Sequence, residues 1–119
     1  MSRFQSPLDT WDSDRRQLYA WARDVSKRFV FGSFTWNPPS VGATTTVDTT
    51  LTTTDTDQVT GLREGMEVHV TPPSDLTAGL IVGAAWCPDT DELTIRLGNV
   101  TAAPINQGSG TWVFRAFAT

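Results

Sequence analysis

The stretch that decides the fold is TTTVDTTLTTTDTDQVTGL, residues 44–62, which is rich in threonine and contains no lysine or arginine. A disordered, mucin-like stalk and the exposed strands of a β protein share such a composition. Residues 41–52 resolve the choice because their side chains alternate in character. The positions on one side are Val41, Ala43, Thr45 and Val47, and those on the other are Thr44, Thr46 and Asp48. This period of two, with β-branched threonines suited to a pleated surface, predicts a strand over residues 41–52 with one face in water. The following TTTDTDQ is expected to form a loop or a sheet edge.

The same alternation recurs along the rest of the chain. Turn residues separate further short runs that are typical of strands: FVFGSFTW (29–36), MEVHV (66–70), LIVGAAW (80–86), LTIRL (93–97) and TWVFRAFA (111–118). LIVGAAW is mostly apolar, as a strand covered on both faces would be. In the last run we expect Trp112, Phe114 and Ala116 to face one way. Six or so short strands at this spacing predict a mainly β fold, an antiparallel β-sandwich or jelly-roll.

The first 30 residues have a different pattern. RRQLYAWARDVSKRF (15–29) contains no glycine or proline, and Ser13 or Asp12 before it suits a helix N-cap. A narrow apolar stripe runs along this segment. Trp11, Leu18 and Val25 recur every seven residues, and Trp21 lies between the last two at the second position of a heptad seam. The sequence therefore predicts an N-terminal arm, SRFQSPLD, and one α-helix that lies on the β domain, on copies of itself or on a partner. We divide the chain into residues 1–30 and residues 31–119.

Charge is unevenly distributed between these two parts. Residues 1–30 hold six basic groups against four aspartates, a net charge of +2, and residues 31–119 hold three arginines against nine acids, a net charge of −6. An acidic body argues against nucleic acid as a partner. No apolar run approaches the roughly 18 residues of a membrane span. The N-terminus lacks the basic-then-apolar pattern of a secretion signal, so we expect folding in a cytosol.

The sequence offers little for catalysis or metal binding. Cys87 and His69 are the only cysteine and histidine, and nothing in the sequence pairs them as nucleophile and base. The acidic groups of the turns, Asp55 with Asp57 and Asp89 with Asp91 and Glu92, lack the spacing of an EF-hand loop. We expect these carboxylates to be solvated or to bond backbone amides. The prediction is a protein that is not an enzyme and needs no cofactor or metal.

The order of the segments along the chain carries further information. TW-NPPS, a Thr/Val strand, the segment VTGLREGMEVHVTPPSDLTAGLIVGAAWCPDTDELTIRLGNVTAAPI (59–105) and a Gly-led aromatic strand follow one another in an order that resembles a β-sandwich domain of tailed-bacteriophage virion proteins. The pattern V-x-G-L-x-x-G-x-x-V-x-V and the segment LTIRLGNVT carry the resemblance, which covers about residues 31–117. Such domains occur in head decoration (cement) proteins, head fibres and tail-fibre ends. The resemblance implies a virion structural role, usually as a homotrimer, without catalytic residues.

These observations together predict a capsid decoration protein, made in the host cytoplasm and located on the virion. It would bind the major capsid protein or another virion protein through its first 30 residues and display an acidic β domain. The expected partner-binding residues are Arg3, Phe4, Trp11, Arg15, Arg16, Leu18, Trp21, Arg23 and Val25. The alternatives are a tail-fibre or baseplate component, or a carbohydrate-binding module. An exposed Trp36 in a flat aromatic row favours the carbohydrate alternative, whereas Trp86 and Trp112 are expected in the core.

Overall fold

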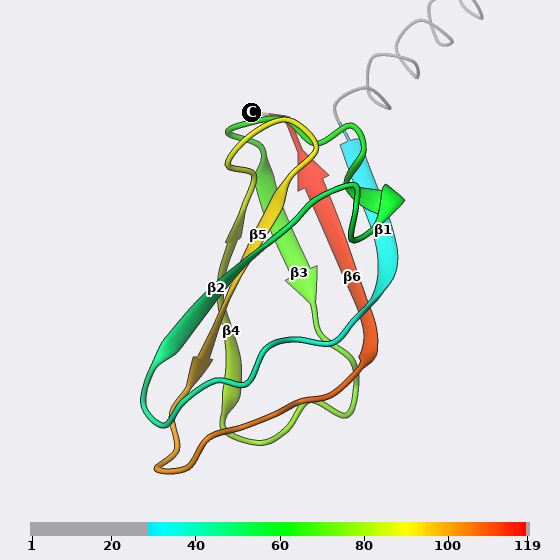
Figure 1. Cartoon of the computed structure of the whole chain (residues 1–119). Coiled ribbons are helices and arrows are strands. Elements are labelled where there is room, and N and C mark those ends of the chain that lie inside the picture. Colours follow the sequence, from blue (N-terminus) through cyan, green and yellow to red (C-terminus); the bar gives the residue numbers. More distant parts are fainter. Residues whose placement is uncertain (1–28, 119) are drawn as a thin grey trace, which may run out of the picture.

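Six antiparallel strands run through residues 29–118, the part of the chain that the computed structural model describes (Figure 1). The strands are β1 (Phe29–Trp36), β2 (Thr46–Leu51), β3 (Glu67–Thr71), β4 (Leu80–Trp86), β5 (Leu93–Asn99) and β6 (Gly110–Phe117). A short 3-10 helix, η1 (Asp57–Val59), lies between β2 and β3. The predicted mainly β, antiparallel fold is confirmed. The predicted N-terminal arm and α-helix lie outside the described residues. None of the described helices is long and apolar enough to cross a membrane.

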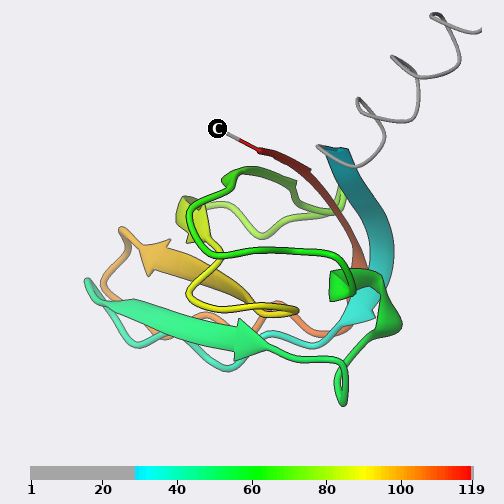
Figure 2. The ribbon, with the colours of Figure 1, turned by 90° about the horizontal axis from the view of Figure 1, so that it is seen from above.

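The strands form one sheet in the order β1-β6-β3-β4-β5-β2. The sheet curls into a half-barrel, so that its two edge strands, β1 and β2, flank the open side (Figure 2). The sandwich or jelly-roll prediction called for two sheets packed face to face, and residues 29–118 form a single sheet instead. Curling explains the difference, because a strongly bent sheet encloses its own core and needs no second layer. A register shift between Val82 and Ala84 marks a β-bulge in β4, a feature that increases strand bending.

The core fills the concave side of this sheet. Its largest fully buried side chains are Trp112, Phe114, Leu62, Leu93, Ile95, Leu97, Val41 and Val59. The expectation that Trp112, Phe114 and Ala116 face one way is confirmed, since all three are buried. β4 departs from the prediction, because Ile81 is 49% exposed. LIVGAAW is therefore covered on its concave side and faces outward on the other.

The aromatic residues of β1 divide between the two faces of the sheet. Phe34 and Trp36 are buried on the concave side, whereas Phe31 is 67% exposed. Phe31 and Phe34 are three positions apart, and side chains separated by an odd number of positions point to opposite faces of a strand. Every second position from Phe29 to Thr35 consequently lies on the convex face.

The threonine-rich stretch forms the β2 edge, as its alternation predicted. Thr46, Asp48 and Thr50 are exposed, whereas Leu51 is buried. The strand begins at Thr46 rather than at residue 41, because the chain turns where Thr45 N donates to Gly42 O at 3.3 Å. Val41 nevertheless pairs with Ile105 in an isolated bridge, so the earlier segment still joins the fold.

The two ends of the sheet differ in charge. At the junction end, where residue 28 meets β1, Phe29 pairs with Phe117 and the loops 52–66 and 87–92 lie beside them (Figure 1). These loops carry six acidic residues and one arginine. The distal end is formed by the loops 37–45, 72–79 and 100–109, whose one charged residue is Asp75. The acidity of the β domain is therefore concentrated at the end of the sheet where residue 28 meets Phe29 of β1.

Candidate functional site

All nine predicted partner-binding residues, from Arg3 to Val25, lie in residues 1–28, outside the described part of the chain. What the structure does show is the surface that their segment adjoins. The first candidate site is the junction end of the sheet, and the second is the pocket on the open side of the half-barrel.

Three phenylalanines gather on the convex face at the junction end. The ring of Phe29 lies 5.4 Å from that of Phe31 and 4.8 Å from that of Phe117, centroid to centroid, and both pairs are edge-to-face. We call Phe29, Phe31 and Phe117 the junction patch. His69 of β3 borders it, with its ring 6.1 Å from that of Phe117. The sequence analysis assigned no function to these residues. In FVFGSFTW, however, Phe29 and Phe31 must face the side of the strand opposite to Phe34 and Trp36, so one of the two aromatic pairs had to face outward.

Polar groups frame the junction patch. Arg115 lies opposite Phe31 in the register of β6 and β1 and also opposite His69 in that of β6 and β3. His69 Nε2 lies 3.3 Å from Glu67 Oε1, and both side chains are 63% exposed. An exposed pair of this kind contributes little to stability. An apolar centre with a charged rim is the usual anatomy of a protein-binding surface.

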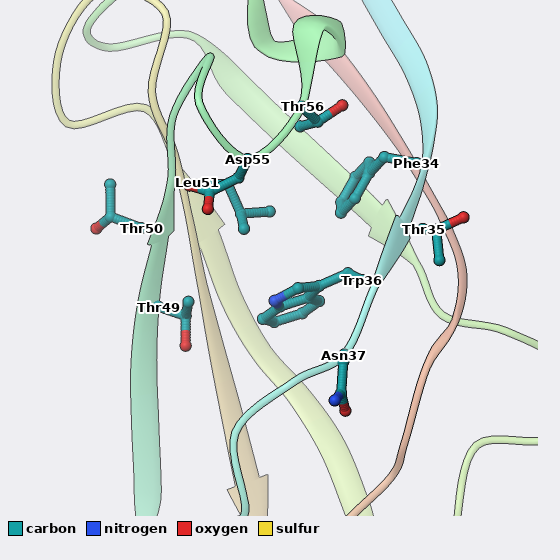
Figure 3. A pocket seen from close by; sticks show the side chains of 9 residues that line it. All are labelled: Phe34, Thr35, Trp36, Asn37, Thr49, Thr50, Leu51, Asp55 and Thr56. Carbon is teal, nitrogen blue, oxygen red and sulfur yellow. The ribbon is translucent and has the colours of Figure 1, made fainter.

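A pocket opens between β1 and β2, with a volume of about 300 Å³ (Figure 3). Its lining combines two buried aromatic rings with hydroxyl, amide and carboxylate groups, from Phe34, Thr35, Trp36, Asn37, Thr49, Thr50, Leu51, Asp55 and Thr56. Several of these polar groups already have partners. Asp55 Oδ2 accepts from Thr52 N at 2.8 Å, and Thr56 Oγ1 accepts from Gln58 N at 3.2 Å. The polar groups of Thr35, Asn37 and Thr49 make no side-chain hydrogen bond within residues 29–118, so they are the ones that a ligand in this pocket would meet.

The three tryptophans within residues 29–118 do not form a flat exposed row. Trp36 is 8% exposed and meets the fully buried Trp112 edge-to-face, at 5.0 Å between ring centroids. Trp86 is half-buried on the convex face, where the Arg96 guanidinium lies 5.2 Å from its ring centroid. The expected core position is confirmed for Trp112 but is wrong for Trp86, which the β4 strand places on the outer face of the sheet. Burial of Trp36 reduces the support for the carbohydrate alternative, because sugar stacking needs an accessible ring face.

Cys87 and His69 lie in different environments, since Cys87 is buried and His69 is exposed. Cys87 is 3% exposed, and burial raises the pKa of its thiol to about 11. Such a thiol is a poor nucleophile at neutral pH, because the thiolate is the reactive form. His69 is exposed on the convex face, with Glu67 as its polar contact. The two residues do not make a nucleophile–base pair.

Carboxylates in the acidic turns accept hydrogen bonds from backbone amides, as expected. Asp91 Oδ1 accepts from Gly61 N at 2.8 Å, and Asp89 Oδ1 accepts from Thr90 N at 2.7 Å. Asp91 N also donates to Leu62 O at 2.9 Å, which joins the two junction-end loops. Within residues 29–118, no group of three or more His, Cys, Asp or Glu side chains is placed to hold a metal ion.

One ion pair stands on the convex face near β2. Arg96 Nε donates to Asp48 Oδ1 at 2.7 Å and Arg96 Nη2 donates to Asp48 Oδ2 at 3.0 Å. The hydrogen bond from Arg96 lowers the pKa of the Asp48 carboxyl. The pair joins β2 to β5 across the register position that these residues share. The two parallel hydrogen bonds from Arg96 to Asp48 link neighbouring strands of the sheet, so we assign this ion pair a structural role.

Comparison with known proteins gives no match to a family model, to a curated protein or to a solved structure.

Proposed function

We propose that this protein is a structural component of a tailed-bacteriophage virion, most simply a capsid decoration (cement) protein. Residues 1–30 attach it to the major capsid protein or to another virion protein, and the β domain is displayed. The proposed assembly is a homotrimer, with no nucleic acid or membrane among its partners. The resemblance of the segment order to virion β domains is the source of this proposal.

The observation that carries the proposal is the placement of the chain's entry into the sheet. Phe29 pairs with Phe117 at the junction end, so an anchor on residues 1–28 holds the domain by one end. The three distal loops then lie at the opposite end (Figure 1). A tether at one end of a self-contained β domain suits a protein that is attached to a particle and presents its far surface.

Charge at the junction end refines the expected partner surface. Residues 1–30 carry six basic groups, and the loops at the end of the sheet where β1 begins carry six acidic residues. A partner that is acidic throughout would attract the segment but repel these loops. We therefore expect a partner surface with both signs of charge, and attachment that weakens as salt is added.

The loops of the distal end are held by hydrogen bonds, which suits a surface that is displayed. Asn99 Nδ2 donates to Val41 O at 3.0 Å and to Ala103 O at 2.7 Å, which ties two distal loops to β5. Gln107 Oε1 accepts from Thr77 N at 2.7 Å, which ties the third loop to them. Loops fixed in this way present a defined surface at low entropic cost.

Copy number per particle is the test. Quantitative mass spectrometry of purified virions, with the major capsid protein as internal reference, would give hundreds of copies for a head decoration protein. A few copies would favour the tail-fibre or baseplate alternative. Absence from particles that contain every other structural protein would overturn the virion proposal. The carbohydrate alternative predicts binding on a glycan array that is lost on substituting Trp36 or Asn37.

A further inference from the structure

The pocket between β1 and β2 contains a hydrogen-bond donor that the described part of the chain leaves without a partner. Trp36 is 8% exposed, and its indole Nε1 makes no hydrogen bond within residues 29–118. Among the side chains of these residues, the one fully buried polar atom without a partner is Trp112 Nε1. Trp36 Nε1 is therefore not sealed in the core, and it meets the open volume of the pocket. Figure 3 shows the indole reaching from β1 toward Thr49 of β2, with its nitrogen on the side of Thr49.

The other polar groups of the pocket differ in burial and in chemistry. Thr49 is half-buried, whereas Asn37 and Asp55 are exposed at the opening. Asp55 Oδ2 accepts from Thr52 N at 2.8 Å and from Thr52 Oγ1 at 3.3 Å, so Oδ1 is the oxygen that remains for a ligand. The pocket therefore combines a buried donor, a charged acceptor at its mouth, and a hydroxyl and an amide that can act in either role.

The charge of the lining rules out two classes of ligand. Asp55 is its one charged residue, and no lysine, arginine or histidine lines the pocket. A carboxylate, sulfate or phosphate would meet the Asp55 charge without a cation to compensate it. An ammonium group would pair with an exposed carboxylate, which contributes little, and would leave the Trp36 N–H without an acceptor.

Hydroxyl groups match the remaining requirements, because each of them both donates and accepts. We propose that the pocket binds a small uncharged polyol, one sugar unit in size. One hydroxyl accepts from Trp36 Nε1, another donates to Asp55 Oδ1, and Thr49 and Asn37 bind those between them. The volume of about 300 Å³ lies at the lower end of small-molecule sites, which limits the ligand to a single unit.

This mode of recognition uses the edge of the Trp36 indole. It does not need the accessible ring face that sugar stacking requires, so the burial of Trp36 is compatible with it. The inference goes beyond the virion role, which gives the displayed domain no ligand, and it does not depend on that role. It also gives the carbohydrate alternative a defined site and a defined class of sugar.

The indole N–H signals of the full chain, labelled with ¹⁵N-tryptophan, provide the first readout by NMR. The probes are the methyl glycosides of glucose, galactose and mannose, with glucuronic acid as the anionic counterpart. Trp36→Phe assigns the Trp36 signal, because it removes that signal and keeps an aromatic ring. A neutral glycoside should shift the Trp36 signal at millimolar concentration and leave the Trp86 signal in place, while glucuronic acid should shift neither.

Two conservative variants each remove one hydrogen-bonding group from the pocket. Trp36→Phe removes the indole N–H, and Thr49→Val removes a hydroxyl while keeping the shape of the side chain. Each should weaken glycoside binding roughly three- to tenfold in saturation-transfer titrations, the effect of one lost hydrogen bond. Trp86→Phe is the matched control, since Trp86 lies outside the pocket on the convex face, and it should bind as the unsubstituted chain does. Circular dichroism checks the folding of all three variants.

Several results would overturn the inference. It fails if no glycoside of the panel shifts the Trp36 signal, or if either pocket variant, when folded, binds as tightly as the unsubstituted chain. Glucuronic acid that binds as tightly as the neutral glycosides would also contradict it, because Asp55 would then not select against anions. If Trp36→Phe does not fold, Thr49→Val decides. None of these results affects the virion proposal, which the copy number in purified particles tests.

Discussion

Asn99 holds the distal end together through Val41, which lies 58 residues earlier in the chain and accepts a hydrogen bond from Asn99 Nδ2 at 3.0 Å. The same amide nitrogen donates to Ala103 O at 2.7 Å, and Asn99 Oδ1 accepts from Thr101 N at 2.8 Å. Asn99 is 3% exposed. One buried side chain therefore satisfies backbone groups of two loops that would otherwise be free to move.

Asn99→Ala should lower the free energy of unfolding by about 1–3 kcal/mol, because it leaves buried backbone groups without this partner. Asn106→Ala is the matched control, since Asn106 is exposed in the same loop. Urea denaturation followed by tryptophan fluorescence measures both variants. Equal midpoints for the two variants would show that the Asn99 network does not stabilise the fold.

Gly32 allows η1 to pack closely against β1. A Cβ atom built at this position would lie 2.7 Å from Gln58 Cβ and 2.9 Å from Phe114 Cε1. Gly32→Ala should destabilise the protein by about 1–3 kcal/mol through overpacking. At Gly83 the nearest atom to such a Cβ is Arg96 Cγ at 3.6 Å, which is an ordinary contact. Gly83→Ala should therefore shift the thermal midpoint much less, and the reverse order would contradict the packing of η1 on β1.

Cys87 should make stability fall at alkaline pH. Burial raises the pKa of its thiol to about 11, whereas the unfolded thiol ionises near 9.0. The native state thus favours the protonated form, so this contribution is complete below pH 9 and is lost as the pH rises from 9 towards 11. Urea denaturation at pH 8 and pH 10.5 tests this. Cys87→Ala should show a smaller fall between the two pH values, and an equal fall would assign the effect to other groups.

The sequence predicted the local structure better than the architecture. Alternation fixes which side chains share a face, so the buried Trp112 and the exposed Thr46 followed from period two alone. Pairing is a different matter. β1 pairs with β6 and β2 pairs with β5, and such distant partners leave no local periodicity. The curled single sheet therefore could not be distinguished from a sandwich.

The candidate site was predicted only in part. β1 begins at Phe29, next to the boundary at which the sequence was divided, while the division itself stays a prediction because residues 1–28 lie outside the described part of the chain. The sequence left the accessibility of Trp36 beside NPP open, and the structure shows it on the same face as Phe34, with both side chains buried. The junction patch was missed because Phe29 and Phe117 meet only through the β1–β6 pairing. The residues that flank Phe29 and Phe117 in the sequence do not indicate that the two are neighbours in the sheet.

The central claim is that residues 1–28 attach the protein and that the β domain folds without them. The most direct measurement is co-sedimentation of the full chain and of a chain that begins at Phe29 with virions lacking the protein. The account predicts that the truncated chain unfolds cooperatively in a thermal melt yet stays in the supernatant, while the full chain pellets with the particles. A truncated chain that is unfolded, or that pellets as well as the full chain, would contradict it.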